Sequence, residues 1–299
     1  MSRLHWVALA ATGRIGGRTI TRLLAHFGSL EASFDAGRDA LMQVPGIGPR
    51  LADTLLAIDL PAVAARLSAW QQAGISILTW EDAAYPANLL TLPDAPPVLF
   101  VRGAFCEGDA RAVAIVGTRQ PTAESARLAE RLGSELAERS WVIVSGLALG
   151  IDAAAHRGAL AAGGRTLAVL GSGVDAIYPR SHRRLAEEVA ARGALCAEVP
   201  PGSTVSRPAL IARNRITSGL SRAVIVVQSH ADSGSANTAR RAIEQGRTVF
   251  AVTGGQAGKS VLVTQGTIPL SPDVDFDVLA ARLDDLSAQP SPPEQPRLL

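Results

Sequence analysis

The stretch WVIVSGLALGIDAAAH, residues 141–156, decides the fold. It begins with Val142–Val144, a short β-branched run of the kind found in buried parallel strands. Ser145 and Gly146 end that run, and an alanine-rich segment with Asp152 near its start follows. Asp152 stands where a helix N-terminus favours an acceptor or a negative charge. The stretch therefore predicts a strand, a small-residue turn and a helix.

From residue 111 onward, similar apolar runs alternate with helical patterns at the spacing of β-α-β units. The predicted strands are Val113–Val116, Val142–Val144, Leu167–Leu170, Leu195–Ala197, Val224–Val227 and Val249–Val252. The predicted helices lie near residues 122–139, 151–162, 182–191, 208–219 and 236–245. This alternation predicts an α/β fold with a doubly wound parallel sheet.

Residues 1–66 show helical patterns and two glycine-containing turns, Arg14–Arg18 and Pro45–Arg50, each followed by an apolar helix pattern. The second turn resembles the helix-hairpin-helix motif, whose exposed backbone N–H groups can bind a phosphate without reading sequence. A turn kept for packing between two helices would explain the same glycines. The candidate residues for a secondary phosphate contact are Gly46, Gly48 and Arg50.

Residues 67–110 contain two short strand patterns, Ile75–Leu78 and Val98–Val101, between proline-rich turns. These strands are expected to flank the main sheet. The Pro/Ser/Gln-rich residues 286–299 predict a flexible tail. The chain thus divides into a helical domain (1–66), a sheet domain (67–285) and a tail (286–299).

Bulk composition excludes several classes of protein. A hydrophobic content of 47% and a mean hydropathy of +0.19 indicate a globular core. The net charge of +2 does not by itself indicate a protein that binds nucleic acid. The two cysteines, Cys106 and Cys196, have no partner spacing for a disulfide framework or a zinc site. We therefore expect no metal. No segment is long and apolar enough to span a membrane, and no leader pattern opens the chain, so we expect a cytoplasmic protein.

Two motifs resemble nucleotide-binding signatures. Gly171–Ala176 matches G-x-G-x-x-A, but Tyr178 precedes Pro179 and therefore avoids the helix that this fingerprint must open. Residues 254–260 resemble a P-loop, but Thr253 stands where its first glycine is required. We therefore expect neither NAD binding nor ATPase chemistry, and no cofactor.

Ser145, Asp152 and His156 are the residue types of a catalytic triad, yet they crowd one strand-turn-helix unit. Asp152 and His156 are four residues apart, so we expect the pair to stabilise one face of the helix rather than to catalyse a reaction.

Small-residue turns follow most of the predicted strands, and arginines stand beside them. In a doubly wound sheet these turns meet in one crevice at the carboxyl edge. Glycine and serine N–H groups backed by arginines make a phosphate-binding surface wider than one nucleotide needs, although a solvated basic helix face is the plainer alternative. The turns and arginines are Gly117–Arg119, Ser145–Gly146, Gly171–Gly173, Gln228–Asn237, Arg207, Arg213–Arg215 and Arg222.

The same motifs stand in the order of a known family: Gly117–Arg119, Ser145–His156, Ala168–Pro179, Arg213–Ser221, Ser233–Ala239 and Gly246–Val252. The chain resembles the DNA-processing protein A family (DprA, also called Smf) over nearly its whole length. The resemblance implies a Rossmann-like sheet domain, a small N-terminal helix-hairpin-helix (SAM-like) domain and a role that is not enzymatic. Such proteins bind single-stranded DNA without sequence specificity and load the recombinase RecA onto it during natural transformation and recombination.

The partners that the resemblance implies are single-stranded DNA, RecA, single-strand binding protein and a second copy of the chain. The implied DNA contacts are Arg119, Ser145, Gly146, Gly171, Ser172, Gly173, Arg180, Arg213, Asn214, Arg215, Ser235 and Asn237, with secondary contacts at Gly46, Gly48 and Arg50. The implied homodimer interface is Val261, Leu262 and Val263.

The chain also departs from the family pattern. Arg207–Leu210 lacks the usual phenylalanine before Arg213, which removes a possible base-stacking platform. Many relatives carry a C-terminal winged-helix domain, which we expect this chain to lack. The alternative function is a nucleotide-binding, phosphoribohydrolase-like enzyme or a nucleotide sensor of the same superfamily. Those enzymes use a glutamate in a PGGxGTxxE pattern, and Ser233–Ala239 offers no acid there, which favours binding.

Overall fold

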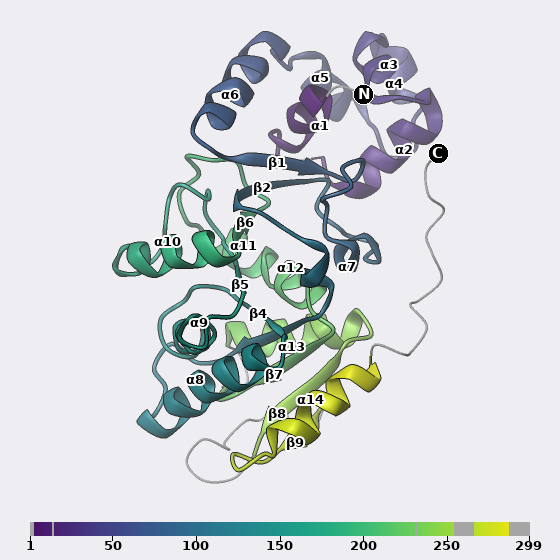
Figure 1. Ribbon diagram of the computed structural model, residues 1–299. Helices are drawn as coiled ribbons and strands as arrows, with labels where there is room; N and C mark the ends of the chain where they lie inside the picture. The colour runs from purple at the N-terminus through teal and green to yellow at the C-terminus, as the bar shows by residue number, and fades with distance from the viewer. Residues whose placement is uncertain (1–2, 14, 231–232, 254–265, 287–299) are drawn as a thin grey trace.

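The computed structural model describes residues 3–13, 15–230, 233–253 and 266–286 (Figure 1). One mixed sheet runs through these residues in the strand order β1-β2-β6-β5-β4-β3-β7-β8-β9. Its strands are β1 (Ser76–Thr79), β2 (Val98–Gly103), β3 (Ala112–Val116), β4 (Val142–Ser145), β5 (Thr166–Val169), β6 (Ala194–Ala197), β7 (Ala223–Val226), β8 (Thr248–Val252) and β9 (Ile268–Leu270).

The strands from β3 to β9 pair in parallel, whereas β1 and β2 add an antiparallel edge next to β6. Every residue of β3 to β7 is buried, as expected for short apolar runs covered on both faces. The doubly wound, mostly parallel sheet is therefore confirmed, and the two strand patterns of residues 67–110 do flank it.

Helices cover both faces of this sheet (Figure 1). One face carries α8 (Ala123–Glu138), α9 (Ile151–Ala161), α10 (Arg183–Arg192) and α14 (Phe276–Asp285), and the other carries α7 (Ala87–Leu90), α11 (Arg207–Ala212), α12 (Asn214–Gly219) and α13 (Gly234–Glu244). The predicted helix 208–219 is thus two helices that meet at Arg213. Both β9 and α14 are elements that the sequence did not predict.

The N-terminal region is helical, as predicted, and it packs against the β1 end of the sheet (Figure 1). Trp6 and Trp80 lie 5.6 Å apart between ring centroids, and Trp70 and Phe100 lie 5.2 Å apart. The helices are α1 (Arg3–Ala10), α2 (Gly17–Phe27), α3 (Leu30–Asp35), α4 (Arg38–Met42), α5 (Pro49–Leu56) and α6 (Leu60–Gln72), and two 3-10 turns, η1 (Glu107–Ala110) and η2 (Arg180–His182), lie in the sheet domain. Because α6 continues through residue 66, the helical pattern extends beyond the proposed domain boundary.

Both glycine turns of this region open helices, since α2 begins at Gly17 and α5 begins at Pro49. In the second turn Gly46 has a φ of 85°, which glycine adopts without strain. Arg22 donates from Nη1 to the Pro45 carbonyl at 3.0 Å, so part of this turn is held by the protein itself. In the described part of the chain, no helix has the length and hydropathy to cross a bilayer.

Candidate nucleic-acid interface

The carboxyl ends of the parallel strands meet at one edge of the sheet, where the small-residue turns follow them. The strand order reverses beside β3, whose neighbours are β4 on one side and β7 on the other. Thr118 donates its N–H to the Gln228 carbonyl at 2.7 Å and so ties together the loops after β3 and β7. Such a reversal point opens a crevice between two loops, which is where doubly wound folds bind their ligands.

The turn after β4 is shaped by Asp152, which lies in the first turn of α9. The Asp152 carboxylate accepts the N–H of Gly146 at 3.1 Å and the N–H of Ala148 at 3.4 Å. Ser145 donates its hydroxyl to the Ile115 carbonyl at 2.7 Å. Ser145 and Gly146 are both predicted DNA contacts, and the Ser145 hydroxyl and the Gly146 N–H already have partners within the protein.

Arg213 lies directly beneath this turn. It enters from the opposite face of the sheet, at the junction of α11 and α12, and only 9% of its surface is exposed. A Cβ on Gly146 would lie 1.5 Å from Nη1 of Arg213, so the guanidinium occupies the space that any larger residue at 146 would need. Its Nη2 lies 3.8 Å from the Asp152 carboxylate, and its Nε has no hydrogen-bond partner among the described residues.

Arg213 faces one acid, Asp152, and a second arginine, Arg119, lies close enough to affect it. Burial lowers the pKa of Arg213, Asp152 opposes that shift, and the nearby charge of Arg119 adds to it. Burial likewise raises the pKa of Asp152, against the attraction of Arg213 and the bonds from Gly146 and Ala148. Arg119 itself is exposed and has no ion-pair partner in the described structure. The site therefore carries uncompensated positive charge, and an anion placed on it would relieve the repulsion between the arginines.

A pocket of about 60 Å³ opens at this position. It has room for about two water molecules, which suits a phosphate group and is far below the volume that encloses a whole small-molecule ligand. The lining residues are Arg119, Gly146, Ala148, Leu149, Tyr178, Pro179, Leu210 and Arg213. Of these, the sequence predicted Arg119, Gly146 and Arg213. Of the others, Ala148, Leu149, Tyr178 and Pro179 lie in turns after strands, so their positions could have indicated them, whereas Leu210 lies in α11.

The turn after β5 lies beside the pocket and does not open a helix, because α10 begins only at Arg183. The turn therefore lacks the helix that a dinucleotide fingerprint must open. A Cβ on Gly171 would lie 2.8 Å from Leu210, Ser172 is buried, and Gly173 donates its N–H to the Ser203 carbonyl at 2.9 Å. Arg180 is exposed at the start of η2.

Three further predicted contacts have partners inside the protein. Arg215 binds Glu198 at 2.7 Å and lies 3.4 Å from Asp94. Asn214 donates its side-chain amide to Asn237 at 3.0 Å. The structure thus gives these side chains roles in joining α12 to its neighbours.

Ser235 lies in a cluster of hydroxyl groups at the start of α13, where its Oγ is 2.8 Å from that of Ser229 and 2.9 Å from that of Ser233. Among the predicted contacts, Arg119 and Arg180 are the exposed cations of the sheet domain. The hairpin residues Gly48 and Arg50 are also exposed, but they belong to the helical region.

The catalytic-triad geometry is not formed. His156 is fully buried, and its Nδ1 lies 2.7 Å from the Thr166 hydroxyl. The expected pairing of Asp152 with His156 is wrong, because Asp152 faces the β4 turn and Arg213 while His156 faces β5.

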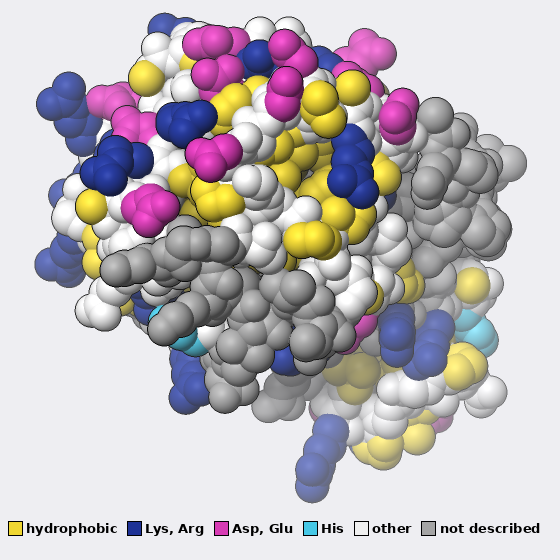
Figure 2. All heavy atoms as spheres, turned by 90° about the horizontal axis from the view of Figure 1, so that it is seen from below, with side chains coloured by type: hydrophobic (Ala, Val, Ile, Leu, Met, Phe, Trp, Pro, Cys, Tyr) yellow, Lys and Arg dark blue, Asp and Glu magenta, His cyan; other side chains and the backbone are white. Residues whose placement is uncertain are grey.

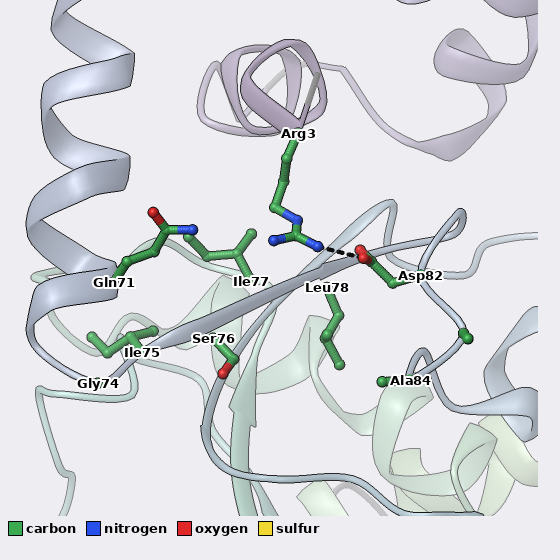
Figure 3. Close-up of a pocket in the computed structure, with 10 residues that line it drawn as sticks. Arg3, Gln71, Gly74, Ile75, Ser76, Ile77, Leu78, Asp82 and Ala84 are labelled. Carbon is green, nitrogen blue, oxygen red and sulfur yellow. Dashed lines mark hydrogen bonds and ion pairs between the residues drawn. The ribbon is translucent and has the colours of Figure 1, made fainter. Parts of the chain in front are cut away.

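A larger hollow of about 580 Å³ lies elsewhere, between α1, α6 and β1 (Figure 3). Arg3 reaches across it to bind Asp82. None of the glycine turns at the carboxyl edge lines it. Residues 261–263, the P-loop-like residues 254–260 and the tail from 287 lie outside the described residues.

These observations define a Rossmann-like α/β protein with a small cationic pocket at the carboxyl edge of its sheet, lined by the loops after β3, β4 and β5 and by residues of the α11–α12 segment. Residues 76–269 match the family DNA recombination-mediator protein A, and residues 9–57 match the SAM-like helix-hairpin-helix tandem. The chain belongs to the DNA recombination-mediator protein A family.

Individual relatives agree with this assignment. Protein Smf of Synechocystis is 39% identical over 253 residues, which cover 83% of this chain but only 64% of that protein. The structure of DprA from Streptococcus pneumoniae superposes with a TM-score of 0.79 at 32% identity and covers 94% of this chain and 98% of its own. A DprA structure from Helicobacter pylori, described for its single-stranded DNA binding mode, gives a TM-score of 0.62 at 28% identity and covers 71% of this chain and 96% of its own.

Proposed function

We propose that this chain binds single-stranded DNA along the carboxyl edge of its sheet without reading sequence, and that it hands the strand to RecA in the cytoplasm. The observation that carries the proposal is a phosphate-sized pocket lined by two arginines, Arg119 and Arg213, of which Arg213 lies 3.8 Å from the Asp152 carboxylate. A strand needs several such phosphate contacts on an open edge, and the exposed Arg180 supplies a further cation there. The single-stranded DNA binding mode of the Helicobacter pylori relative supports the same kind of ligand here.

The pocket also favours strand binding over the alternative of a nucleotide enzyme or sensor. Sites that enclose a whole ligand have volumes of roughly 300–1,000 Å³. The pocket of about 60 Å³ is far smaller than this range. We therefore propose binding and assign no catalytic residue, metal or cofactor.

The experiment is a mobility-shift titration with single-stranded DNA, duplex DNA and nucleoside monophosphates. We expect the single strand to bind most tightly. Arg119→Glu should remove binding, because it adds repulsion to a lost contact, whereas Arg66→Glu, an exposed arginine on α6, should leave it unchanged. Arg50→Glu in the hairpin should weaken it only modestly. Equal losses in all three variants would refute the assignment of the crevice, and release of free base from a monophosphate would support an enzyme.

The recombination-mediator family supports RecA as the downstream partner. The test is the rate at which RecA forms filaments on strands coated with single-strand binding protein. Addition of this chain should shorten the delay, and Arg119→Glu should not. An unchanged delay with the unaltered chain would contradict loading.

We also propose a homodimer through Val261, Leu262 and Val263, which lie outside the described residues. Two crevices on one strand would raise avidity by roughly 10²–10⁴ without any new type of contact. Leu262→Arg should therefore give a folded monomer with weaker binding to long strands. A dimer that persists in light scattering would place the interface elsewhere.

A further inference from the structure

Tyr178 differs from every other aromatic residue of the chain. Its surface is 46% exposed, whereas the remaining tryptophan, phenylalanine and tyrosine residues are buried or half-buried. The other tyrosine, Tyr85, is buried and donates its hydroxyl to the Pro96 carbonyl at 2.6 Å. Among the described residues, Tyr178 makes neither a hydrogen bond nor a ring contact, so packing gives no reason for an aromatic ring at this position.

The ring stands on the rim of the pocket that Arg119 and Arg213 line. Leu149 on the same rim is 47% exposed, and Ile211 at the end of α11 is 45% exposed. Single exposed apolar residues are ordinary on protein surfaces, but here Leu149 and Tyr178 line a cationic pocket together with Pro179 and Leu210, and Ile211 follows Leu210 in the chain. The pocket thus has a charged floor and an apolar rim.

The volume of the pocket suits the phosphate of a nucleotide and not its base. About 60 Å³ accommodates a phosphate group, so the attached base must leave the pocket across its rim. We propose that Tyr178 provides the surface on which one base of the bound strand stacks, and that this contact makes the crevice select unpaired DNA. The inference rests on the proposed function and adds to it the contact that tells a single strand from a duplex.

Stacking explains that selection physically. Contacts to phosphate do not distinguish single-stranded from double-stranded DNA, because both present the same group. The face of a base, by contrast, is free to stack on a side chain only when the base is unstacked. Tyr178 is the one aromatic residue among those that line the pocket, and Arg207–Leu210, the segment that ends at the lining residue Leu210, contains none. Tyr178 accepts any base, because every base has an aromatic face.

The test combines two strands with three variants. The strands are an oligothymidylate and an abasic phosphodiester of the same length, which keeps the phosphates and lacks the bases. The variants are Tyr178→Ala, Tyr178→Phe and the control Ile243→Ala, which shortens an exposed apolar residue on α13. Affinity is measured at equal salt, and circular dichroism reports folding.

We expect Tyr178→Ala to bind oligothymidylate about tenfold more weakly than the unaltered chain, in line with the loss of one stacked base. Its affinity for the abasic strand should not change, because that strand has nothing to stack. Tyr178→Phe and Ile243→Ala should bind both strands like the unaltered chain. If Tyr178→Ala fails to fold, Tyr178→Leu replaces it in the same comparison.

Other outcomes overturn the inference. Equal loss on both strands would show that Tyr178 supports the pocket rather than a base, and equal loss in Tyr178→Phe would assign the effect to the hydroxyl. Unchanged affinity in Tyr178→Ala would show that no base stacks there. Each of these results leaves the proposed function intact, whereas failure of the unaltered chain to bind either strand would refute that function itself.

Discussion

At the scale of the residue, Gly146 is required by the buried guanidinium beside it. Replacing it with alanine would place Cβ 1.5 Å from Nη1 of Arg213, so either the β4 turn or the arginine must move. We expect Gly146→Ala to lower the free energy of unfolding by about 1–3 kcal/mol, the usual range for overpacking, and to weaken single-strand binding at least about tenfold. Urea titration and mobility shifts measure the two effects.

The matched control is Gly234→Ala at the start of α13, where a Cβ meets nothing within 4 Å. That variant should change stability by less than about 0.5 kcal/mol. If Gly146→Ala behaves like Gly234→Ala, the guanidinium does not occupy the place that the structure gives it.

His156 makes stability depend on pH. Thr166 donates its hydroxyl to the Ile143 carbonyl at 2.7 Å, so it accepts the Nδ1–H of a neutral His156, whose Nε2 has no partner in the described structure. Burial, with the charges of His182 and Arg213 nearby, lowers the pKa of His156 to about 3. The unfolded chain then binds a proton that the folded chain does not, so stability falls as pH drops from about 6.5 towards 3.

Between pH 7 and pH 5 this group alone should remove about 2 kcal/mol from the free energy of unfolding. In His156→Asn, which keeps an N–H donor but cannot take up that proton, the fall over the same interval should be smaller by this amount. Urea midpoints at the two pH values measure it. An identical fall in both proteins would mean that His156 is protonated in the folded state.

At the scale of the element, α8 and α9 approach so closely that glycine is needed on both helices. A Cβ on Gly158 would lie 2.0 Å from the Glu130 carbonyl oxygen, and one on Gly133 would lie 2.3 Å from that of Ala155. Because α9 carries Asp152, moving the helix also disturbs the β4 turn. Gly158→Ala should therefore lower the free energy of unfolding by about 1–3 kcal/mol and weaken DNA binding as well.

The control is Gly108→Ala in η1, where the nearest atom to a new Cβ is the Cys106 sulfur at 3.7 Å. We expect its unfolding curve to overlay that of the unaltered chain. A Gly158→Ala protein with unchanged stability would show that the two helices can separate without cost.

The sequence predicted the parallel strands to within about one residue, because each is a short apolar run buried on both faces. The sequence did not predict the break between α11 and α12 at Arg213. Arg213 itself has helical backbone angles, and neither proline nor glycine marks the junction. The sequence also missed β9 because a three-residue strand with Pro269 at its centre carries almost no strand signal.

The sequence likewise predicted one part of the candidate site and missed another. The turns could be predicted, since small residues after strand ends are visible in the sequence. The burial of Arg213 could not, because it depends on α11 arriving from the other face of the sheet. Arg213→Glu would therefore place a second acid against Asp152. We expect it to lower the free energy of unfolding and not only the affinity for DNA.

At the scale of the whole molecule, the salt dependence of binding reports local rather than total charge. The net charge of the chain is only +2, and the face seen in Figure 2 carries acidic and basic side chains side by side. We therefore expect attraction for a polyanion to come from exposed cations at the carboxyl edge, such as Arg119 and Arg180. The logarithm of the affinity for single-stranded DNA should fall linearly with the logarithm of salt concentration, with a slope of about −0.7 for each phosphate contacted.

Removing one such contact should change that slope by a known amount. Arg119→Ala should make it shallower by about 0.7, because one phosphate then keeps its counterions, whereas Arg66→Ala on α6 should leave it unchanged. Fluorescence anisotropy of a labelled oligonucleotide from about 50 to 200 mM salt measures both slopes. If Arg119→Ala lowers affinity equally at every salt concentration, Arg119 supports the shape of the pocket and does not neutralise a phosphate.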